Sequence, residues 1–315
     1  MNTPPPAAAA ARPDLAVTIA GIQMQNPVTV ASGTFGYGKE YAHLVDLRQL
    51  GAITVKGIRL QPWDGNPLPR HVEVPGGMVN AIGLQGPGVA GFIRDYLPFL
   101  REVGVPVLVN IWGTSVEEYA EVAERLSDVE GIAGLEVNIS CPNVKEGGAS
   151  FGADPRTVAA LVAAVRRRTR LPLIPKLAPN VPNIRPYAQA AAEAGADALS
   201  LINTIPAMVI NIETRRPVLA NKVGGLSGPA IHPVAVKLVW DAAQAVKIPI
   251  IAMGGITGPE QAIEFLIAGA SAVAVGTATF IDPGTVLRVI AGIEDYLVRH
   301  QIQRVRDLTG SLLTT

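Results

Sequence analysis

The feature that most constrains the fold of this 315-residue chain is a regular alternation of short apolar runs with longer stretches of helical periodicity. Near-continuous apolar runs are typical of parallel strands that are covered on both faces. The predicted strands are residues 28–31, 53–56, 107–111, 135–139, 173–177, 198–202, 250–253 and 272–275. The predicted helices between them include residues 40–50, 115–126, 154–169, 184–194, 232–245 and 259–268. This alternation predicts an α/β fold built from eight strand–helix units.

Glycine turns after the last two predicted strands favour a closed (β/α)8 TIM barrel over an open doubly wound sheet. Barrels commonly build phosphate sites at this place, where the chain carries Gly254-Gly255 and Gly276-Thr277. A dinucleotide-binding open sheet would carry GxGxxG after its first strand, and residues 32–36 lack that pattern. We therefore expect one barrel domain over residues 14–315, behind a disordered Pro/Ala-rich tail at residues 1–13. A short N-terminal β-hairpin is expected before the first barrel strand, from residues 17–19 and 22–24, and should cover the bottom of the barrel.

Composition excludes several classes of protein. Hydrophobic residues make up 49% of the chain and charged residues 17%, which argues against general disorder. Lys and Arg together number 26, as do Asp and Glu, so the charge gives no reason to expect nucleic acid or an anionic membrane as partner. No apolar stretch is long enough to span a bilayer. The single cysteine excludes an internal disulfide, and the four scattered histidines predict no metal site. This cysteine usage fits a reducing compartment, so we expect a cytoplasmic protein.

Polar residues at the carboxyl ends of the predicted strands mark a candidate site, because barrel enzymes act at that face. They are Ser32, Lys56, Asn110, Asn138, Lys176 and Asn203-Thr204, and the two glycine turns follow them. A buried lysine needs an anion, a polarised ligand or a structural carboxylate. The strand segments supply no carboxylate near either lysine, so we favour a ligand. The asparagines suit a flat, amide-rich substrate because an amide both donates and accepts, although some could only brace loops.

Cys141 follows the fourth predicted strand in a polar, glycine-rich loop. A free cysteine is usually a small buried hydrophobe, but over a barrel mouth its thiol could act as a base or a nucleophile. No histidine lies nearby in the sequence, so a Cys–His hydrolase has little support.

Two unusually long connections, residues 57–89 and 203–231, also follow strand ends and are expected to contact the substrate.

Taken together, these motifs resemble those of the class 1 dihydroorotate dehydrogenases, and most closely the catalytic subunit of type B. The resemblance runs from about residue 15 to residue 291. It rests on residues 31–34, 54–57, 65–67, 80–84, 138–143, 203–204, 224–230, 254–256 and 276–277. Residues 80–84 look like type B, whereas type A usually has serine and methionine there. Class 2 enzymes use a serine base and a membrane segment, and this sequence shows neither.

The resemblance implies one FMN per chain and oxidation of (S)-dihydroorotate to orotate in the synthesis of pyrimidine nucleotides. Cys141 would remove the proton from substrate C5 while hydride leaves C6 for flavin N5. The implied substrate contacts are Lys56, Asn80, Ala81, Ile82, Gly83, Leu84, Asn138, Asn143, Asn203 and Thr204. The implied FMN contacts are Ser32, Lys56, Gly57, Asn110, Asn138, Lys176, Ile202, Gly228, Gly254, Gly255, Gly276 and Thr277. Asn80 and Asn143 could equally be turn residues.

The resemblance also implies a partner subunit that carries FAD and an iron–sulfur cluster and passes electrons to NAD. A chain with one cysteine cannot ligate such a cluster by itself. The expected assembly is a heterotetramer, with a homodimer of this chain at its core. Trp112, close to Asn110, is bulkier than the resemblance leads us to expect.

Three alternatives stay open. The first is an FMN enzyme that resembles the substrate domain of dihydropyrimidine dehydrogenase and acts on uracil or thymine. The second is a flavin-free, phosphate-binding barrel lyase or isomerase. The third is a catalytically silent FMN-binding subunit.

Overall fold

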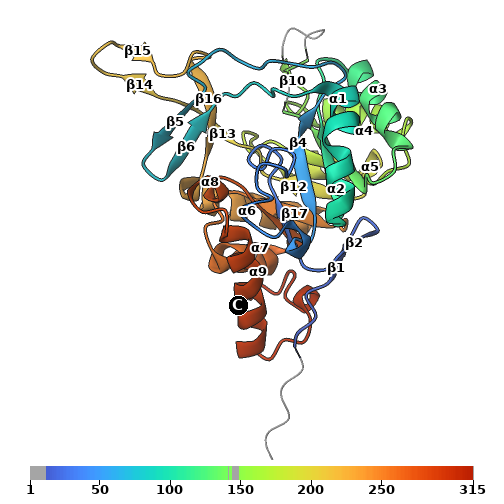
Figure 1. Ribbon diagram of the computed structural model, residues 1–315. Helices are drawn as coiled ribbons and strands as arrows, with labels where there is room; N and C mark the ends of the chain where they lie inside the picture. Colours follow the sequence, from blue (N-terminus) through green and yellow to red (C-terminus); the bar gives the residue numbers. More distant parts are fainter. Residues whose placement is uncertain (1–11, 141, 144–148, 315) are drawn as a thin grey trace, which may run out of the picture.

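Eight parallel strands form one sheet in a computed structural model of the protein, which describes residues 12–140, 142–143 and 149–314 (Figure 1). The strands are β3 (Val28–Val30), β4 (Ile53–Ile58), β7 (Val107–Ile111), β8 (Gly134–Asn138), β11 (Leu173–Leu177), β12 (Leu199–Leu201), β17 (Ile250–Met253) and β18 (Ala272–Val275). Their order is β3-β18-β17-β12-β11-β8-β7-β4. The hydroxyl oxygens of Thr29 on β3 and Thr54 on β4 are 3.2 Å apart, and this contact joins the two ends of the sheet. The predicted TIM barrel is confirmed, and its strands lie within two residues of the predicted ranges.

Helices cover the outside of the barrel. They are α1 (Gly88–Asp95), α2 (Leu97–Val103), α3 (Val116–Ser127), α4 (Pro155–Arg166), α5 (Arg185–Glu193), α6 (His232–Ala245), α7 (Pro259–Ala268), α8 (Ala278–Ile281) and α9 (Thr285–Arg299). The side chains of Ser115 and Asp154 cap α3 and α4 by accepting backbone N–H groups of Glu118 and Arg156. Helices α3 to α7 confirm five of the predicted helices.

The predicted helix at residues 40–50 is wrong. The segment forms turns and a short 3-10 helix, η1 (Leu47–Gln49). Asp46 has an extended backbone, and its carboxylate accepts the Arg48 N–H, so it begins a new helix where the predicted one should continue. Tyr41 stacks on Phe35, with 4.0 Å between ring centres, and donates its hydroxyl to the Thr34 carbonyl. These contacts fold the segment back onto the loop that follows β3.

The predicted N-terminal hairpin is present as β1 (Val17–Ile19) and β2 (Ile22–Met24), paired antiparallel. Ile22 and Met24 pack against Gly134 and Gly51, which lie at the amino ends of barrel strands. The hairpin therefore covers the floor of the barrel, as predicted. The predicted disordered tail lies outside the described residues, apart from residues 12 and 13.

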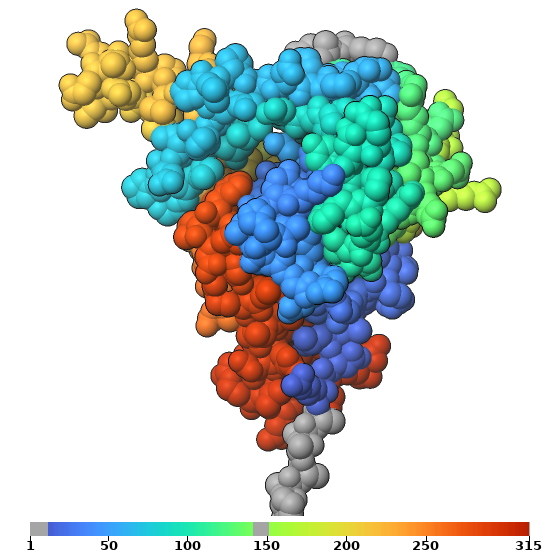
Figure 2. All heavy atoms as spheres, in the orientation of Figure 1, coloured from blue at the N-terminus to red at the C-terminus, as the bar shows by residue number. Residues whose placement is uncertain are grey.

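A second sheet stands at the carboxyl end of the barrel and was not predicted. It contains β5 (His71–Val74), β6 (Gly77–Asn80), β13 (Ile205–Met208) and β16 (Val223–Ser227), in the antiparallel order β13-β16-β6-β5. Its strands come from both of the long connections, and Asn80 lies opposite Gly225. We call this four-stranded unit the cap sheet. Beyond it, the hairpin of β14 (Ile210–Asn211) and β15 (Arg216–Pro217) stands away from the body of the molecule (Figure 2).

Candidate active site

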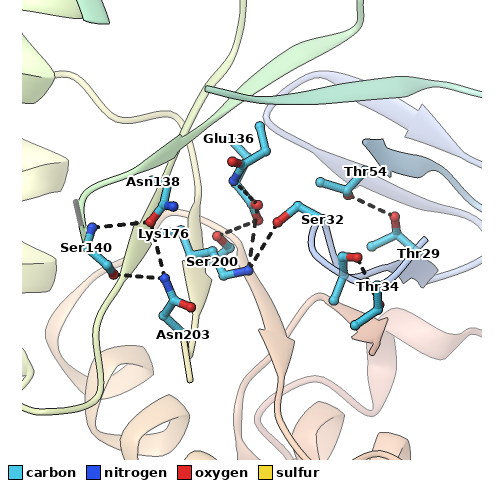
Figure 3. Close-up of polar contacts among 12 residues, drawn as sticks. Thr29, Ser32, Thr34, Thr54, Glu136, Asn138, Ser140, Lys176, Ser200 and Asn203 are labelled. Carbon is cyan, nitrogen blue, oxygen red and sulfur yellow. Dashed lines mark hydrogen bonds and ion pairs between the residues drawn. The ribbon is translucent and has the colours of Figure 1, made fainter. Parts of the chain in front are cut away.

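A buried lysine lies at the centre of the barrel mouth. Lys176, at the end of β11, is only 7% exposed. Its ammonium group lies 3.4 Å from the Ser32 hydroxyl and 3.8 Å from a carboxylate oxygen of Glu136 (Figure 3). Ser32 follows β3, so residues from opposite parts of the sequence meet at this ammonium group, as the strand-end pattern predicted.

Glu136 corrects the expectation that the strands supply no carboxylate near either lysine. It lies inside β8, is 2% exposed, and accepts hydrogen bonds from Asn110 (2.6 Å) and Ser200 (2.9 Å). Its immediate neighbours, Leu135 and Val137, are apolar, and only the acidic side chain in that run could have signalled its role. Lys176 therefore has a structural partner as well as a place in the candidate site.

A second cluster of amides lies beside it. The Asn203 side chain donates to the Asn138 amide oxygen at 3.2 Å and to the Ser140 hydroxyl at 2.9 Å. The Asn138 oxygen also accepts the Ser140 backbone N–H at 3.2 Å, which closes a triangle of polar groups (Figure 3). This triangle fixes the chain immediately before residue 141.

Lys56, at the end of β4, differs from Lys176. Its ammonium group makes no hydrogen bond or ion pair with any other residue that the structure describes. Burial lowers the pKa of Lys56, the Arg70 charge lowers this pKa further, and Glu40 opposes the shift. A half-buried cation of this kind is suited to an anionic ligand.

Gly57, next to Lys56, leaves no room for a side chain. A Cβ there would lie 2.9 Å from the Asn110 amide oxygen and 3.0 Å from an indole carbon of Trp112. Trp112 is 5% exposed, and its indole nitrogen has no hydrogen-bond partner in the described part of the chain. The unexpectedly large Trp112 is thus a wall of the candidate site.

The two glycine turns form a backbone cradle on the other side of the mouth. A Cβ on Gly255 would lie 2.7 Å from the His232 Cβ and 2.9 Å from the Gly228 carbonyl oxygen, and the Gly255 φ of +71° favours glycine. Within the described residues, the backbone N–H groups of Gly255, Gly276 and Thr277 donate no hydrogen bond. Free N–H groups that a side chain cannot cover are suited to a phosphate. Ile202, 3% exposed, packs beside Gly254.

The cap sheet brings the remaining predicted substrate contacts over the mouth. Residues 81–84 continue from Asn80 at the end of β6. Asn66 fixes the shape of this segment, since its side-chain amide donates to the Ala81 carbonyl and its backbone N–H donates to the Ile82 carbonyl, at 3.0 Å each. Gly83 and Leu84 both have positive φ, and a Cβ on Gly83 would lie 2.5 Å from the Asn66 nitrogen. This loop is therefore a fixed wall of the site.

The other long connection meets this loop. The Asn80 amide donates to the Gly225 carbonyl at 3.4 Å, and Thr204 packs directly over Gly225. Residues 80–84 and Asn203-Thr204 therefore belong to one wall of the candidate site.

Comparison with known proteins identifies the family. The sequence matches the family model described as dihydroorotate dehydrogenase over residues 14–297. The chain belongs to the dihydroorotate dehydrogenase family.

Close relatives of this family member share its length. A protein of Geotalea uraniireducens is 55% identical over 303 residues, which cover 96% of this chain and 99% of the relative. A protein of Geotalea daltonii is 56% identical over 96% of this chain and 99% of its own length. A protein of Desulforudis audaxviator is 56% identical over 94% of this chain and 96% of its own length. All three are named dihydroorotate dehydrogenase B (NAD(+)), catalytic subunit.

Two predicted site residues of this dihydroorotate dehydrogenase family member lie in the segment after β8. Cys141 lies outside the described residues. Asn143 lies in the short strand β9 (Pro142–Asn143), which pairs with β10 (Ala149–Ser150). Among the described residues, no group of three or more His, Cys, Asp or Glu side chains could hold a metal ion, and no helix is long and apolar enough to cross a membrane.

Proposed function

We propose that this chain is the FMN-binding catalytic subunit of a dihydroorotate dehydrogenase that oxidises (S)-dihydroorotate to orotate. The observation that carries the proposal is the ring of lysine, asparagine and glycine residues at the barrel mouth of a chain from this family. Its full-length relatives bear the name of the NAD(+)-linked catalytic subunit.

The residues present fit FMN. The free backbone N–H groups of Gly255, Gly276 and Thr277 would hold the phosphate, with Gly228 and Gly254 shaping the cradle. Ser32, Lys56, Gly57, Asn110, Asn138, Lys176 and Ile202 would surround the ring system. Bound FMN supplies the acceptor for a hydride. The positive charge of Lys176 favours electron uptake at that place.

Substrate recognition would come from the polar groups on the other side of the mouth. The amides of Asn138 and Asn203 offer donors and acceptors to the ring amides of dihydroorotate. Lys56, which has no partner among the described residues, would contact the substrate carboxylate as well as the cofactor. Residues 80–84 and Thr204 would close the site from the cap sheet, and Asn143 would join them.

Proton removal is assigned to Cys141. Dihydroorotate would lose two hydrogens: the Cys141 thiolate would take the C5 proton, and bound FMN would supply the acceptor for the hydride from C6. The Asn138–Ser140–Asn203 triangle supports this role because it anchors the residue before Cys141. A general base must lie within reach of the proton that it removes, and it does not need a histidine beside it.

Electrons must then leave the chain. We propose a partner subunit with FAD and an iron–sulfur cluster, which passes them to NAD. The single cysteine of this chain supports a cluster in another subunit. A cytoplasmic location stays a prediction.

We further propose that two copies of this chain form the core of the assembly. Three alternate residues of the protruding segment, Met208, Ile210 and Ile212, are 49%, 55% and 81% exposed. Met208 ends β13, Ile210 lies in β14 and Ile212 begins the turn that follows, and exposed apolar side chains gathered in this way are typical of a contact with another chain. Sedimentation of the chain expressed alone tests this, since Ile210→Lys with Ile212→Lys should shift a dimer to monomer. A wild-type monomer would contradict it.

The central experiment uses the purified chain with and without co-expressed partner. We expect yellow protein that contains FMN, is reduced by dihydroorotate but not by dihydrouracil, and reduces NAD only with an iron–sulfur flavoprotein bound. Colourless protein would favour a flavin-free barrel enzyme, and reduction by dihydrouracil would favour a dihydropyrimidine dehydrogenase-like enzyme. Cys141→Ala should retain FMN but lose most turnover. An unchanged rate would indicate a silent subunit.

A further inference from the structure

We propose that Glu136 is a positioning residue, which orients the Asn110 amide so that its oxygen accepts a hydrogen bond from the imide N–H of the bound flavin. This inference rests on the proposed function for the identity of the ligand. It assigns a role to a buried acid that the mechanism above does not use.

The orientation of the Asn110 amide follows from chemistry. Asn110 lies opposite Glu136 in the pairing of β7 with β8, and its amide nitrogen is 2.6 Å from a Glu136 oxygen. A carboxylate can only accept, so the nitrogen of the amide must face it. The Asn110 oxygen therefore points away from Glu136 and toward Gly57. A Cβ atom on Gly57 would lie 2.9 Å from this oxygen. The site therefore offers an acceptor at this point and selects a ligand with a donor.

Glu136 is itself held in place. Ser200, on β12, donates to its second oxygen at 2.9 Å, and both residues are almost fully buried. A buried carboxylate with two donors and a cation 3.8 Å away is well satisfied, and its rotamer is fixed by three different strands. An amide that hydrogen-bonds to so rigid an anion cannot flip without breaking a charge-assisted hydrogen bond.

Glu136 also moderates the charge of Lys176. The two side chains are 8% and 3% exposed, so water screens them poorly. The negative charge offsets part of the positive potential that Lys176 brings to the cofactor. Removing only the charge of Glu136 should therefore make reduction of the bound flavin easier.

Two flavins separate this inference from the proposed function. FMN has an imide hydrogen, whereas 3-methyl-FMN does not. We expect the wild-type protein to bind FMN at least tenfold more tightly than 3-methyl-FMN, as measured by quenching of flavin fluorescence. Glu136→Met should lose most of this preference because the Asn110 amide can then flip. If the wild-type protein binds no flavin, the proposed function fails. If Glu136→Met binds flavin and keeps the full preference, only the inference on Glu136 fails.

Two further variants keep the test decisive should Glu136→Met fail to fold. Asn110→Leu removes the acceptor and should also lose the preference. Glu136→Gln keeps an acceptor for Asn110, so it should retain the preference while the midpoint potential of bound FMN moves to a more positive value. A preference retained in Asn110→Leu, or an unchanged potential in Glu136→Gln, would overturn the assignment.

Discussion

The guanidinium group of Arg59 lies over the indole ring of Trp112, 4.9 Å from the ring centre. Trp63 lies 5.3 Å from the same guanidinium group, and Glu118 forms an ion pair with it at 2.8 Å. Arg59 is thus placed among two aromatic rings and a carboxylate beside the candidate flavin site. The size of Trp112 has a physical reason, since it provides an aromatic face for this cation.

Trp112→Ala should lower the free energy of unfolding by about 3–5 kcal/mol, because it opens a cavity and removes a cation–π contact. Trp112→Phe should cost only about 1–2 kcal/mol, since the indole nitrogen has no described partner to lose. Urea denaturation measures both changes. Trp63→Ala is the control, because Trp63 is 45% exposed and should cost less than Trp112→Ala. Equal losses for the two alanine variants would argue against this account.

Lys56→Met should stabilise the flavin-free protein near neutral pH while it weakens binding of flavin and substrate. Burial and Arg70 lower the folded-state pKa of Lys56 below 10.5, so the unfolded chain binds the Lys56 proton more tightly. The resulting penalty is present below the lowered pKa and is relieved as the pH rises through it toward 10.5. The difference in melting temperature between variant and wild type should therefore shrink at alkaline pH. A constant difference would contradict this cause.

Gly255→Ala should weaken FMN binding at least tenfold, because its methyl group would collide with His232 and the Gly228 carbonyl. Gly21→Ala is a matched control for backbone strain alone. Gly21 also has positive φ, but its Cβ would meet no atom within 4 Å. Thermal unfolding should show a modest loss of stability in Gly21→Ala and a larger one in Gly255→Ala, because only the Gly255 methyl group collides with its neighbours. Flavin titration should show a loss of affinity only in Gly255→Ala.

Thr54→Val should destabilise the barrel by about 1–2 kcal/mol, because it leaves the buried Thr29 hydroxyl without its partner. Adding Thr29→Val should recover part of this loss, since no unpaired hydroxyl then remains. A double-mutant cycle in urea measures the coupling. Additive effects of the two substitutions would show that the hydroxyl contact does not help to close the sheet.

Much of the barrel could be predicted because its strands and helices follow local rules. Apolar runs predicted the strand positions to within two residues, and helices α3 and α4 begin within one residue of the predicted starts, each behind a capping side chain, Ser115 or Asp154. The prediction for residues 40–50 failed because tertiary contacts of Tyr41 and the turn at Asp46 outweigh helical periodicity. The cap sheet was missed because its pairings join two distant connections and leave no local pattern.

The candidate site was partly predictable for the same reason. Parallel strands bring their carboxyl ends together, so Ser32 and Lys176 could be expected to meet. Which groups pair within that space depends on side-chain packing, and Glu136 went unnoticed as the partner of Lys176 and Asn110. Cys141 remains a prediction from the resemblance.

The pairing of Asn80 with Gly225 joins residues that lie 145 positions apart along the chain. Closing so long a loop is unfavourable until the strands between have already assembled. On a growing chain the first half of the cap sheet must therefore wait for the second, with the edge of β6 unpaired in the meantime. The two halves of the cap sheet therefore come together only after the barrel strands between them, so formation of the site is tied to folding of the barrel.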